Sequence, residues 1–187
     1  MIRCFVAIPF SPPPVLAQTV AVLRSDFEED RIRWVPLDQL HLTLRFFGDI
    51  TSEAAGEVAR RLEDTFSRDC AFYVEVCGLD LFYDRGKRPV VLWAGMGSDK
   101  QLTHMRGRLD EALEGIGLPG INKRFKPHLT LARIKELRDG IAFRDRLAPF
   151  SREVFGRVGV ERIILYRSIL KQHGPDYHVL KEVPFRE

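Results

Sequence analysis

The sequence predicts an α+β fold that combines helices with antiparallel β-sheets. Short segments in which apolar and polar residues alternate recur along the chain, and such segments are typical of strands with one buried face. Two longer segments have apolar residues at helical spacing, but they do not alternate regularly with the strands as in a parallel sheet. The tetrapeptide His-Leu-Thr-Leu occurs at residues 41–44 and again at 128–131, which predicts a duplicated, bilobal arrangement whose lobes face one another.

The elements of the first half follow from this pattern and from capping residues. A buried strand is expected over residues 2–10, and Ser11 is then expected as the N-cap of a helix that reaches about Arg24. Thr51 and Ser52 are the capping residues expected for a second helix, over residues 52–66. The strands expected in this half cover residues 32–35, 40–47, 72–76, 79–83 and 90–94.

The second half contains one more long helix and a C-terminal hairpin. Ser98 is expected to cap this helix, so residues 95–100 form a capped turn; they lack the glycine and lysine spacing of a phosphate-binding loop. A strand over residues 127–134 and a helical segment near 136–146 follow. The last strands are expected over residues 154–160, 163–170 and 177–183. The final two of them are expected to pair as a hairpin.

Composition restricts the class of protein. With 187 residues, of which 45% are hydrophobic, the chain can bury a core as a single domain (1–187) made of two small lobes. The net charge of +3 is too small to require a nucleic-acid partner, although positive charge gathered on one face would permit one. No apolar segment is long enough for a signal peptide or a membrane span, so we expect a soluble protein without a membrane partner.

Cysteine usage predicts the compartment. Cys4, Cys70 and Cys77 are too few and too widely spaced for a disulfide framework, and each is expected to be a small buried side chain. At least one of three thiols must stay unpaired, which fits a reducing cytoplasm. No C-x-x-C or H-x-x-x-H pair occurs, so no metal and no cofactor is expected.

The repeated tetrapeptide places a histidine beside a threonine on each of two strands. Residues i and i+2 of a strand point to the same side, so His41 and Thr43 share one face, as do His128 and Thr130. Two histidines suit phosphodiester cleavage without a metal, because a neutral imidazole can accept a proton while a protonated one donates a proton near neutral pH. The threonine hydroxyls are candidate donors to the phosphate oxygens.

Further candidates lie near these strands. Arg133 follows the second tetrapeptide by two positions and would need a bulge or the end of the strand to reach the histidine face. Lys126 and Arg124 precede this tetrapeptide and are candidate RNA contacts. Phe46 and Phe47 point to opposite strand faces, so one is expected in the core and the other is a candidate for stacking on a base.

Two segments resemble the signatures of one known family. Residues 33–48, RWVPLDQLHLTLRFFG, are similar to the first signature of the 2H phosphoesterases, and residues 125–133, FKPHLTLAR, are similar to the second. The segments FVAIP (5–9) and LYRS (165–168) also resemble this family. More narrowly, the chain resembles the bacterial and archaeal RNA 2′,3′-cyclic phosphodiesterases, formerly called 2′-5′ RNA ligases. The resemblance covers nearly the whole chain.

The resemblance implies a fold, an activity and roles for residues. The implied fold is α+β, with two pseudo-symmetric lobes whose two antiparallel sheets, flanked by helices, enclose a central, basic, V-shaped cleft. The implied reaction opens a terminal 2′,3′-cyclic phosphate on RNA, an oligonucleotide or a nucleotide, and leaves a 2′-phosphate. By resemblance, His41 donates a proton and His128 accepts one, while Thr43, Thr130 and Arg133 hold the phosphate. Some members also join or cleave 2′-5′ linkages, an activity that the sequence leaves open. The enzyme is expected to be a monomer.

Two alternatives from other classes stay open at this point. The chain could be a catalytically idle module of the same fold that binds RNA or nucleotides, although binding alone does not need two groups that exchange protons. It could also be a metallohydrolase with histidine ligands, although neither His-Leu-Thr-Leu motif contains a carboxylate. Turnover of a cyclic phosphate in excess chelator separates the three hypotheses.

Overall fold

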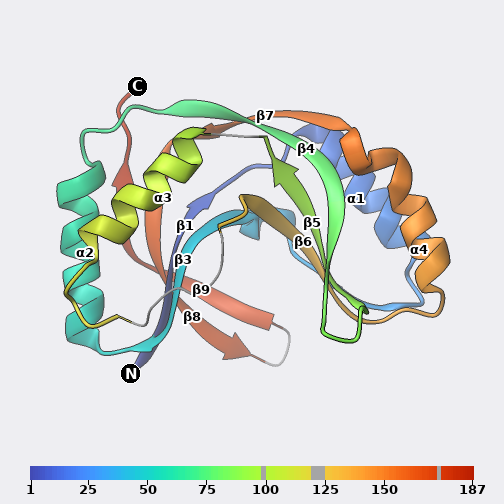
Figure 1. Ribbon diagram of the computed structural model, residues 1–187, viewed down its shortest axis with the longest axis horizontal. Helices are drawn as coiled ribbons and strands as arrows, with labels where there is room; N and C mark the ends of the chain where they lie inside the picture. Colours follow the sequence, from blue (N-terminus) through green and yellow to red (C-terminus); the bar gives the residue numbers. More distant parts are fainter. Residues whose placement is uncertain (98–99, 119–124, 172–173) are drawn as a thin grey trace.

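Two antiparallel β-sheets and four α-helices make up the part of the chain that the computed structural model describes, residues 1–97, 100–118, 125–171 and 174–187 (Figure 1). The predicted α+β class is confirmed. The four-stranded sheet has the order β3–β1–β8–β9, and its strands are β1 (Ile2–Pro9), β3 (His41–Ile50), β8 (Arg162–Lys171) and β9 (Gly174–Pro184). The five-stranded sheet has the order β2–β6–β5–β4–β7, and its strands are β2 (Arg31–Trp34), β4 (Phe72–Tyr83), β5 (Pro89–Met96), β6 (His128–Glu136) and β7 (Val154–Val160).

The helices lie in two pairs at opposite ends of the molecule (Figure 1). One pair is α1 (Pro14–Asp26) and α4 (Gly140–Leu147), and the other is α2 (Ser52–Phe66) and α3 (Lys100–Ala112). Helix α1 contacts β7 of the five-stranded sheet, whereas α2 contacts β8 and β9 of the four-stranded sheet. Two short 3₁₀-helices, η1 (Leu37–Gln39) and η2 (Ala148–Arg152), complete the structure of the described residues. Each sheet therefore has its own helical cover.

Helix α2 shows how the sequence specifies these contacts. Ala55, Val58, Leu62 and Phe66 recur at helical spacing and are all buried, and burial of each large apolar side chain contributes roughly 1.5–3 kcal/mol. The predicted cap at Thr51 is confirmed, because its Oγ1 accepts a hydrogen bond from the backbone amide of the third helical residue, at 3.2 Å. The apolar stripe and the cap together fix where the helix begins and which side it buries.

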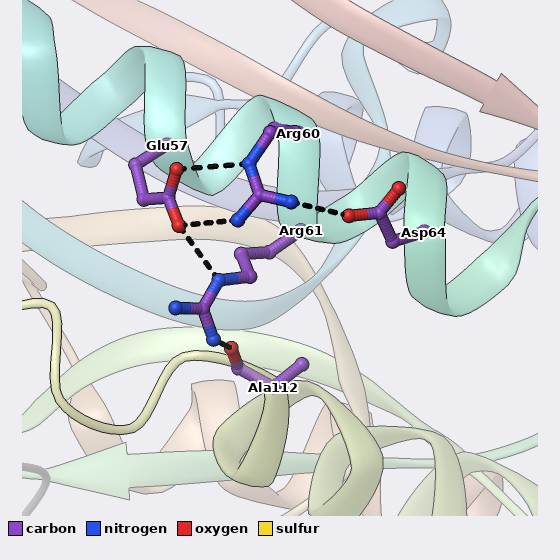
Figure 2. A network of polar contacts seen from close by, with 5 residues as sticks. All are labelled: Glu57, Arg60, Arg61, Asp64 and Ala112. Atoms are coloured by element: carbon purple, nitrogen blue, oxygen red, sulfur yellow. Dashed lines mark hydrogen bonds and ion pairs between the residues drawn. The ribbon is translucent and has the colours of Figure 1, made fainter.

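A polar network on α2 also ties this helix to α3 (Figure 2). The Glu57 carboxylate accepts hydrogen bonds from Arg60 and Arg61, and Arg60 also pairs with Asp64. Arg61 Nη1 donates to the carbonyl of Ala112 at 2.8 Å, at the last residue of α3. The two guanidinium groups lower the pKa of Glu57 to about 2. This network holds α3 in place, and α3 in turn supports strand β3, as described below.

Helix caps differ from expectation in two places. The N-cap predicted at Ser11 was wrong: Pro13 occupies that position without a side-chain hydrogen bond, and proline suits this end because the first turn leaves its amide positions unpaired. The helix expected near 136–146 begins later, because the Asp139 carboxylate accepts hydrogen bonds from the amides two and three residues on. The cap predicted at Ser98 lies outside the described residues.

The strand predictions are confirmed with one merger. The strands expected over 72–76 and 79–83 form one strand, β4, whose pairing with β5 shifts register at Gly78. This glycine has a φ of +69°, and a side chain on it would lie 2.7 Å from the backbone oxygen of Ser151. The predicted C-terminal hairpin is present as β8 paired with β9.

The three cysteines are free thiols in three different environments. Cys4 is fully buried and Cys77 is partly buried, as expected for small apolar side chains. Cys70 is exposed, so the prediction that every cysteine is buried was wrong for this residue. It precedes β4, and its backbone forms an isolated β-bridge with that of Arg186 near the C-terminus. Among the described helices, none is long and apolar enough to cross a membrane.

Candidate active site

The two His-Leu-Thr-Leu segments begin strands β3 and β6, which contact each other across the two sheets (Figure 1). Strand β3 is an edge strand of the four-stranded sheet, and β6 lies next to the edge strand β2 of the five-stranded sheet. His41 and His128 are the first residues of their strands and are both partly buried. The contact between β3 and β6 brings the two strand starts into the same region, where burial, and in addition the charge of Arg133, lower the pKa of His41.

Both histidines are held in the same tautomer. His41 Nδ1 lies 2.8 Å from the carbonyl oxygen of Gln39, and His128 Nδ1 lies 2.7 Å from that of Lys126. A carbonyl oxygen only accepts, so Nδ1 carries the proton in both rings. In the neutral imidazole Nε2 is then the basic atom, and among the described residues neither Nε2 has a hydrogen-bond partner. Both Nε2 atoms are available to a substrate.

Each histidine ring contacts two aromatic side chains of its own sheet, and these two also contact each other, with ring centroids 5.1 Å apart for Phe5–Tyr177 and 5.0 Å apart for Phe82–Trp93. These contacts restrict the orientation of the imidazole in addition to its hydrogen bond to a carbonyl. The ring-centroid distances are 5.2 Å for His41–Phe5, 5.3 Å for His41–Tyr177, 5.0 Å for His128–Phe82 and 5.9 Å for His128–Trp93.

Burial lowers the pKa of both histidines. For His41, the hydrogen bond to the carbonyl opposes this shift, and the charges of Arg133 and His128 add to it. For His128, burial again has the largest effect, the carbonyl opposes it, and the ammonium of Lys126 and then the guanidinium of Arg133 lower the pKa further. Neutral imidazoles are therefore favoured at neutral pH, and a bound anion is what would raise the pKa of one of them enough to protonate it.

A β-bulge in each strand brings a third side chain to the side of the histidine and the threonine. Strand β3 skips Leu44 in its pairing with β1, and β6 skips Leu131 in its pairing with β5. The alternation of the strand changes at this point, so Phe46 and Arg133 are exposed on the histidine side, while the next residue of each strand is buried. The bulge that Arg133 was predicted to need is present. We call the surface formed by His41, Thr43, Phe46, His128, Thr130 and Arg133 the histidine face.

The two bulges are fixed by different partners. The carbonyl of Leu44 accepts a hydrogen bond from Arg106, a buried residue of α3 whose Nε also donates to Asp110 at 2.7 Å. The equivalent carbonyl of Leu131 accepts from the backbone amide of Val35, just after β2, at 2.9 Å. A buried carbonyl needs such a donor because leaving it unpaired costs about 1–3 kcal/mol. These donors hold the bulges and thereby aim Phe46 and Arg133.

The two phenylalanines after the first tetrapeptide divide as predicted. Phe47 is 3% exposed and belongs to the core, whereas Phe46 is 48% exposed on the histidine face. The Arg3 guanidinium lies 4.9 Å from the centre of the Phe46 ring, and the Phe5 ring lies 6.4 Å from it. Contact between Phe46 and a base stays a prediction.

The two basic residues predicted near the second tetrapeptide have different outcomes. Lys126 Nζ lies 4.0 Å from the centre of the Trp93 ring and 3.8 Å from a carboxylate oxygen of Asp80. Its ammonium therefore lies against Phe82 and Trp93, the two aromatic rings that contact His128. Arg124 lies outside the described residues.

Several residues of this region escaped the sequence analysis. Tyr177 and Tyr166 join His41 in lining a small pocket of about 160 Å³ that also reaches Asp38 and Asp176. Arg33 of β2 pairs directly with Arg133 of β6. The tyrosines come from strands remote in sequence, and only sheet pairing brings them to the site. Arg33 had one signal, its place at the start of the first family signature.

No metal-binding cluster is found in the part of the chain that the structure describes. Among these residues, histidine, cysteine, aspartate and glutamate side chains do not come together in groups of three or more that could hold a metal ion. The chemistry visible on the histidine face is that of two imidazoles, two hydroxyls and a guanidinium. Such a set can exchange two protons and bind an anion between them.

These features define a protein in which two antiparallel sheets each contribute one His-x-Thr strand to a shared site. Comparison with known families agrees with this description. A family model described as the 2′-5′ RNA ligase superfamily matches residues 12–169. The chain therefore belongs to the 2′-5′ RNA ligase superfamily.

Individual relatives and structures agree with the family. A protein from Aquifex aeolicus named RNA 2′,3′-cyclic phosphodiesterase is 37% identical over 155 residues, which cover 80% of each chain. A protein of the same name from Aeropyrum pernix is 36% identical over 148 residues, 78% of this chain and 82% of the relative. The structure of TT0787 from Thermus thermophilus matches with a TM-score of 0.80 and 29% identity, over 98% of both chains. E. coli LigT complexed with 3′-AMP matches with a TM-score of 0.75 over 100% of this chain and 99% of LigT; at 22% identity this likeness concerns the fold.

Proposed function

We propose that this chain is an RNA 2′,3′-cyclic phosphodiesterase that hydrolyses a terminal 2′,3′-cyclic phosphate to a 2′-phosphate. The observation that carries the proposal is the matched pair of Nδ1–H···O=C bonds, which leaves two basic Nε2 atoms without a partner among the described residues. An acid–base reaction with two proton transfers needs two such atoms, and a binding site does not. The relatives from Aquifex aeolicus and Aeropyrum pernix that carry this name support the same substrate class.

In this mechanism His128 is the proton acceptor and His41 is the proton donor. His128 Nε2 accepts a proton from water as the water oxygen forms a bond to phosphorus. His41 begins the reaction as an imidazolium, protonated on Nε2 as well as Nδ1, because the bound anionic phosphate raises its pKa. The bond between phosphorus and the 3′ oxygen breaks, and His41 Nε2 donates its proton to that oxygen. The products are a 2′-phosphate and a free 3′ hydroxyl, and proton exchange with solvent restores the pair. Transfers of this kind typically contribute about 10²- to 10⁴-fold to the rate.

Thr43, Thr130 and Arg133 are the proposed phosphate ligands. Both hydroxyls lie on the histidine face, and the bulge in β6 adds the guanidinium to it. Charge builds up on the non-bridging oxygens in the transition state, so fixed donors around them lower the barrier. Arg133 has a second effect, because its charge lowers the pKa of both histidines in the free protein.

The test is turnover of an oligonucleotide that ends in a 2′,3′-cyclic phosphate, in excess chelator and with added magnesium, manganese or zinc. We expect the same rate in all conditions, and a 2′-phosphate in the phosphorus NMR spectrum of the product. Strict dependence on one metal would contradict the two-histidine mechanism. Predominant 3′-phosphate would reverse the donor and acceptor. Tight binding without turnover would identify a binding module instead.

We also infer that the enzyme works as a monomer in a reducing cytoplasm. The supporting observation is that Cys4, Cys70 and Cys77 are free thiols. Sedimentation with and without reductant tests both parts. A single species of 21.5 kDa in both conditions is expected. A dimer that needs oxidation would point to intermolecular pairing through the exposed Cys70.

A further inference from the structure

Arg33 lies beside the histidine face although no part of the proposed mechanism uses it. It is the direct antiparallel partner of Arg133, and side chains of directly paired residues lie on the same side of a sheet. The neighbours of Arg33 in β2, Ile32 and Trp34, are partly buried against the core on the other side. Arg33 is therefore one strand further out than Arg133, a step of about 4.8 Å.

The two arginines form an uncompensated pair of positive charges. Both are exposed, and among the described residues neither has an ion-pair partner. Arg31, two residues earlier in β2, differs because it pairs with Glu136 at 3.1 Å. Like charges directly opposite each other destabilise a sheet. Two adjacent guanidinium groups without a carboxylate are the arrangement expected where an anion binds.

The β8–β9 hairpin brings the other sheet close to this pair. A β-carbon on Gly174 would lie 3.8 Å from Nη1 of Arg33, so the guanidinium reaches the base of the hairpin. Burial raises the pKa of the Tyr177 phenol, three residues after Gly174, and the charges of Arg133 and Arg33 oppose this shift. Tyr177 also contacts His41. The arginine pair thus continues the histidine face and lies between the two sheets.

We propose that Arg33, beside Arg133, binds the phosphodiester that links the terminal nucleotide to the preceding one, while Arg133 holds the cyclic phosphate. This inference rests on the proposed function, which places the cyclic phosphate between the two histidines. The line from His128 through Arg133 to Arg33 leads away from that position, and the next anion on an RNA strand is the adjoining phosphodiester. The enzyme should then prefer an oligonucleotide end to a cyclic mononucleotide.

The experiment compares three substrates that share the same terminal cyclic phosphate. They are a 2′,3′-cyclic mononucleotide, a dinucleotide with a natural phosphodiester, and the same dinucleotide with an uncharged methylphosphonate linkage. For the wild type we expect kcat/KM to be about tenfold higher on the natural dinucleotide than on the other two, from the usual strength of a hydrogen bond to a charged group. The methylphosphonate separates recognition of charge from recognition of the additional base.

Arg33→Gln should remove this advantage and leave turnover of the mononucleotide unchanged. With the natural dinucleotide, the plot of log kcat/KM against log salt should become less steep. Its negative slope should decrease in magnitude by about 0.7, as expected for one lost phosphate contact on a single strand. Arg31→Gln is the matched control: it removes the same charge from the same strand, but from a residue already paired with Glu136. It should retain the preference for the natural dinucleotide.

Each other result overturns the inference. If Arg33→Gln lowers all three rates equally, Arg33 holds the cyclic phosphate or the fold, and no second phosphate site exists. If it lowers none, Arg33 does not contact the substrate. Equilibrium binding of the dinucleotide 2′-phosphate and the mononucleotide 2′-phosphate is measured in parallel. If no substrate is turned over at all, the proposed function is wrong, but the binding measurement still tests the phosphate site. The wild type should bind the dinucleotide more tightly than the mononucleotide, and Arg33→Gln should not.

Discussion

The two His-x-Thr strands can be compared position by position, because the same tetrapeptide begins β3 and β6. In both, the histidine Nδ1 donates to the carbonyl two residues earlier, the threonine lies on the histidine side, and a bulge follows at the last leucine. In both, the bulge brings the residue five positions past the histidine to the same side. These shared features depend on backbone geometry, and the common tetrapeptide accounts for them.

The strands differ in the side chains that flank the motif. Two positions before the histidine, β3 is preceded by Gln39 and β6 by Lys126; five positions after it, β3 has Phe46 and β6 has Arg133. Both charges are thus on the side of the five-stranded sheet. A symmetric pair of imidazoles does not determine which one is the acid and which is the base. In addition to burial, Arg133 lowers the pKa of both histidines, and Lys126 lowers that of His128 further, so Lys126 favours the neutral form of His128, the form that a base requires.

Removal of either histidine should have the largest effect. We expect His41→Ala and His128→Ala each to lower kcat by at least roughly 10²-fold, the usual size of a lost proton transfer. The double variant should lose far less than the product of the two losses, because the pair acts as a unit. His104→Ala, an exposed residue of α3, is the control and should retain full activity. Steady-state kinetics with circular dichroism checks this, and a kcat within about threefold of wild type for either histidine variant would falsify the mechanism.

Of the two residues five positions past the histidines, Arg133 should contribute more to kcat than Phe46. Arg133→Gln removes a charge-assisted contact to phosphate and should lower kcat by about 10- to 100-fold. Phe46→Leu, the equivalent position of the other strand, should leave kcat close to wild type and act through KM if the ring stacks on a base. Measuring kcat and KM separately distinguishes these cases. Equal losses of kcat in both variants would mean that the two strands contribute alike to phosphate binding.

Substitution of the threonines tests the tetrapeptide that the two strands share. Thr43→Val and Thr130→Val each remove one hydroxyl donor and keep both histidines, so each should lower kcat by about tenfold, from the typical strength of one hydrogen bond to a charged group. The two losses should be similar because the hydroxyls occupy equivalent places. Thr103→Val, at an exposed position of α3, controls for the substitution itself. A loss at only one threonine would mean that the phosphate binds to one strand.

The sequence predicts those parts of the histidine face that depend on residues close together in the chain. Alternation along a strand places His41 with Thr43, and the repeated tetrapeptide indicates two such strands. The sequence also indicated that Arg133 needs a bulge or the end of the strand to reach the histidine face, but the matching bulge in β3 appears only in the structure. There, two consecutive residues are buried in each strand, Leu44 with Arg45 and Leu131 with Ala132.

Residues brought to the site by sheet pairing were beyond this kind of analysis. Tyr177 and Phe5 contact His41 from β9 and β1, and Trp93 contacts His128 from β5. Their place depends on strand order and register, which long-range pairing determines and local pattern does not. The cap at Ser11 failed for a related reason, because prolines at the start of α1 replaced the side-chain cap.

The smallest expected effect concerns Lys126, and it tests the difference between the strands most directly. His128 is surrounded by Phe82 and Trp93, and the charged groups that act on it are Lys126 and Arg133. Lys126→Gln creates the residue type found at position 39, and the backbone carbonyl that holds Nδ1 stays in place. Without the ammonium the pKa of His128 rises. The base must be neutral, so the acidic limb of the kcat–pH profile should move to higher pH.

The profile from pH 5 to 9 measures this shift, and both apparent pKa values belong to the coupled pair. Activity on the alkaline side of the optimum should be little changed, because the general base is neutral there in either protein. Lys126→Arg retains the charge and should restore the wild-type acidic limb. Gln39→Ala, the equivalent position next to His41, introduces no change of charge and should leave both limbs in place. If Lys126→Gln instead lowers the rate equally at every pH, Lys126 contacts the substrate and the charge difference between the strands does not set the roles of the histidines.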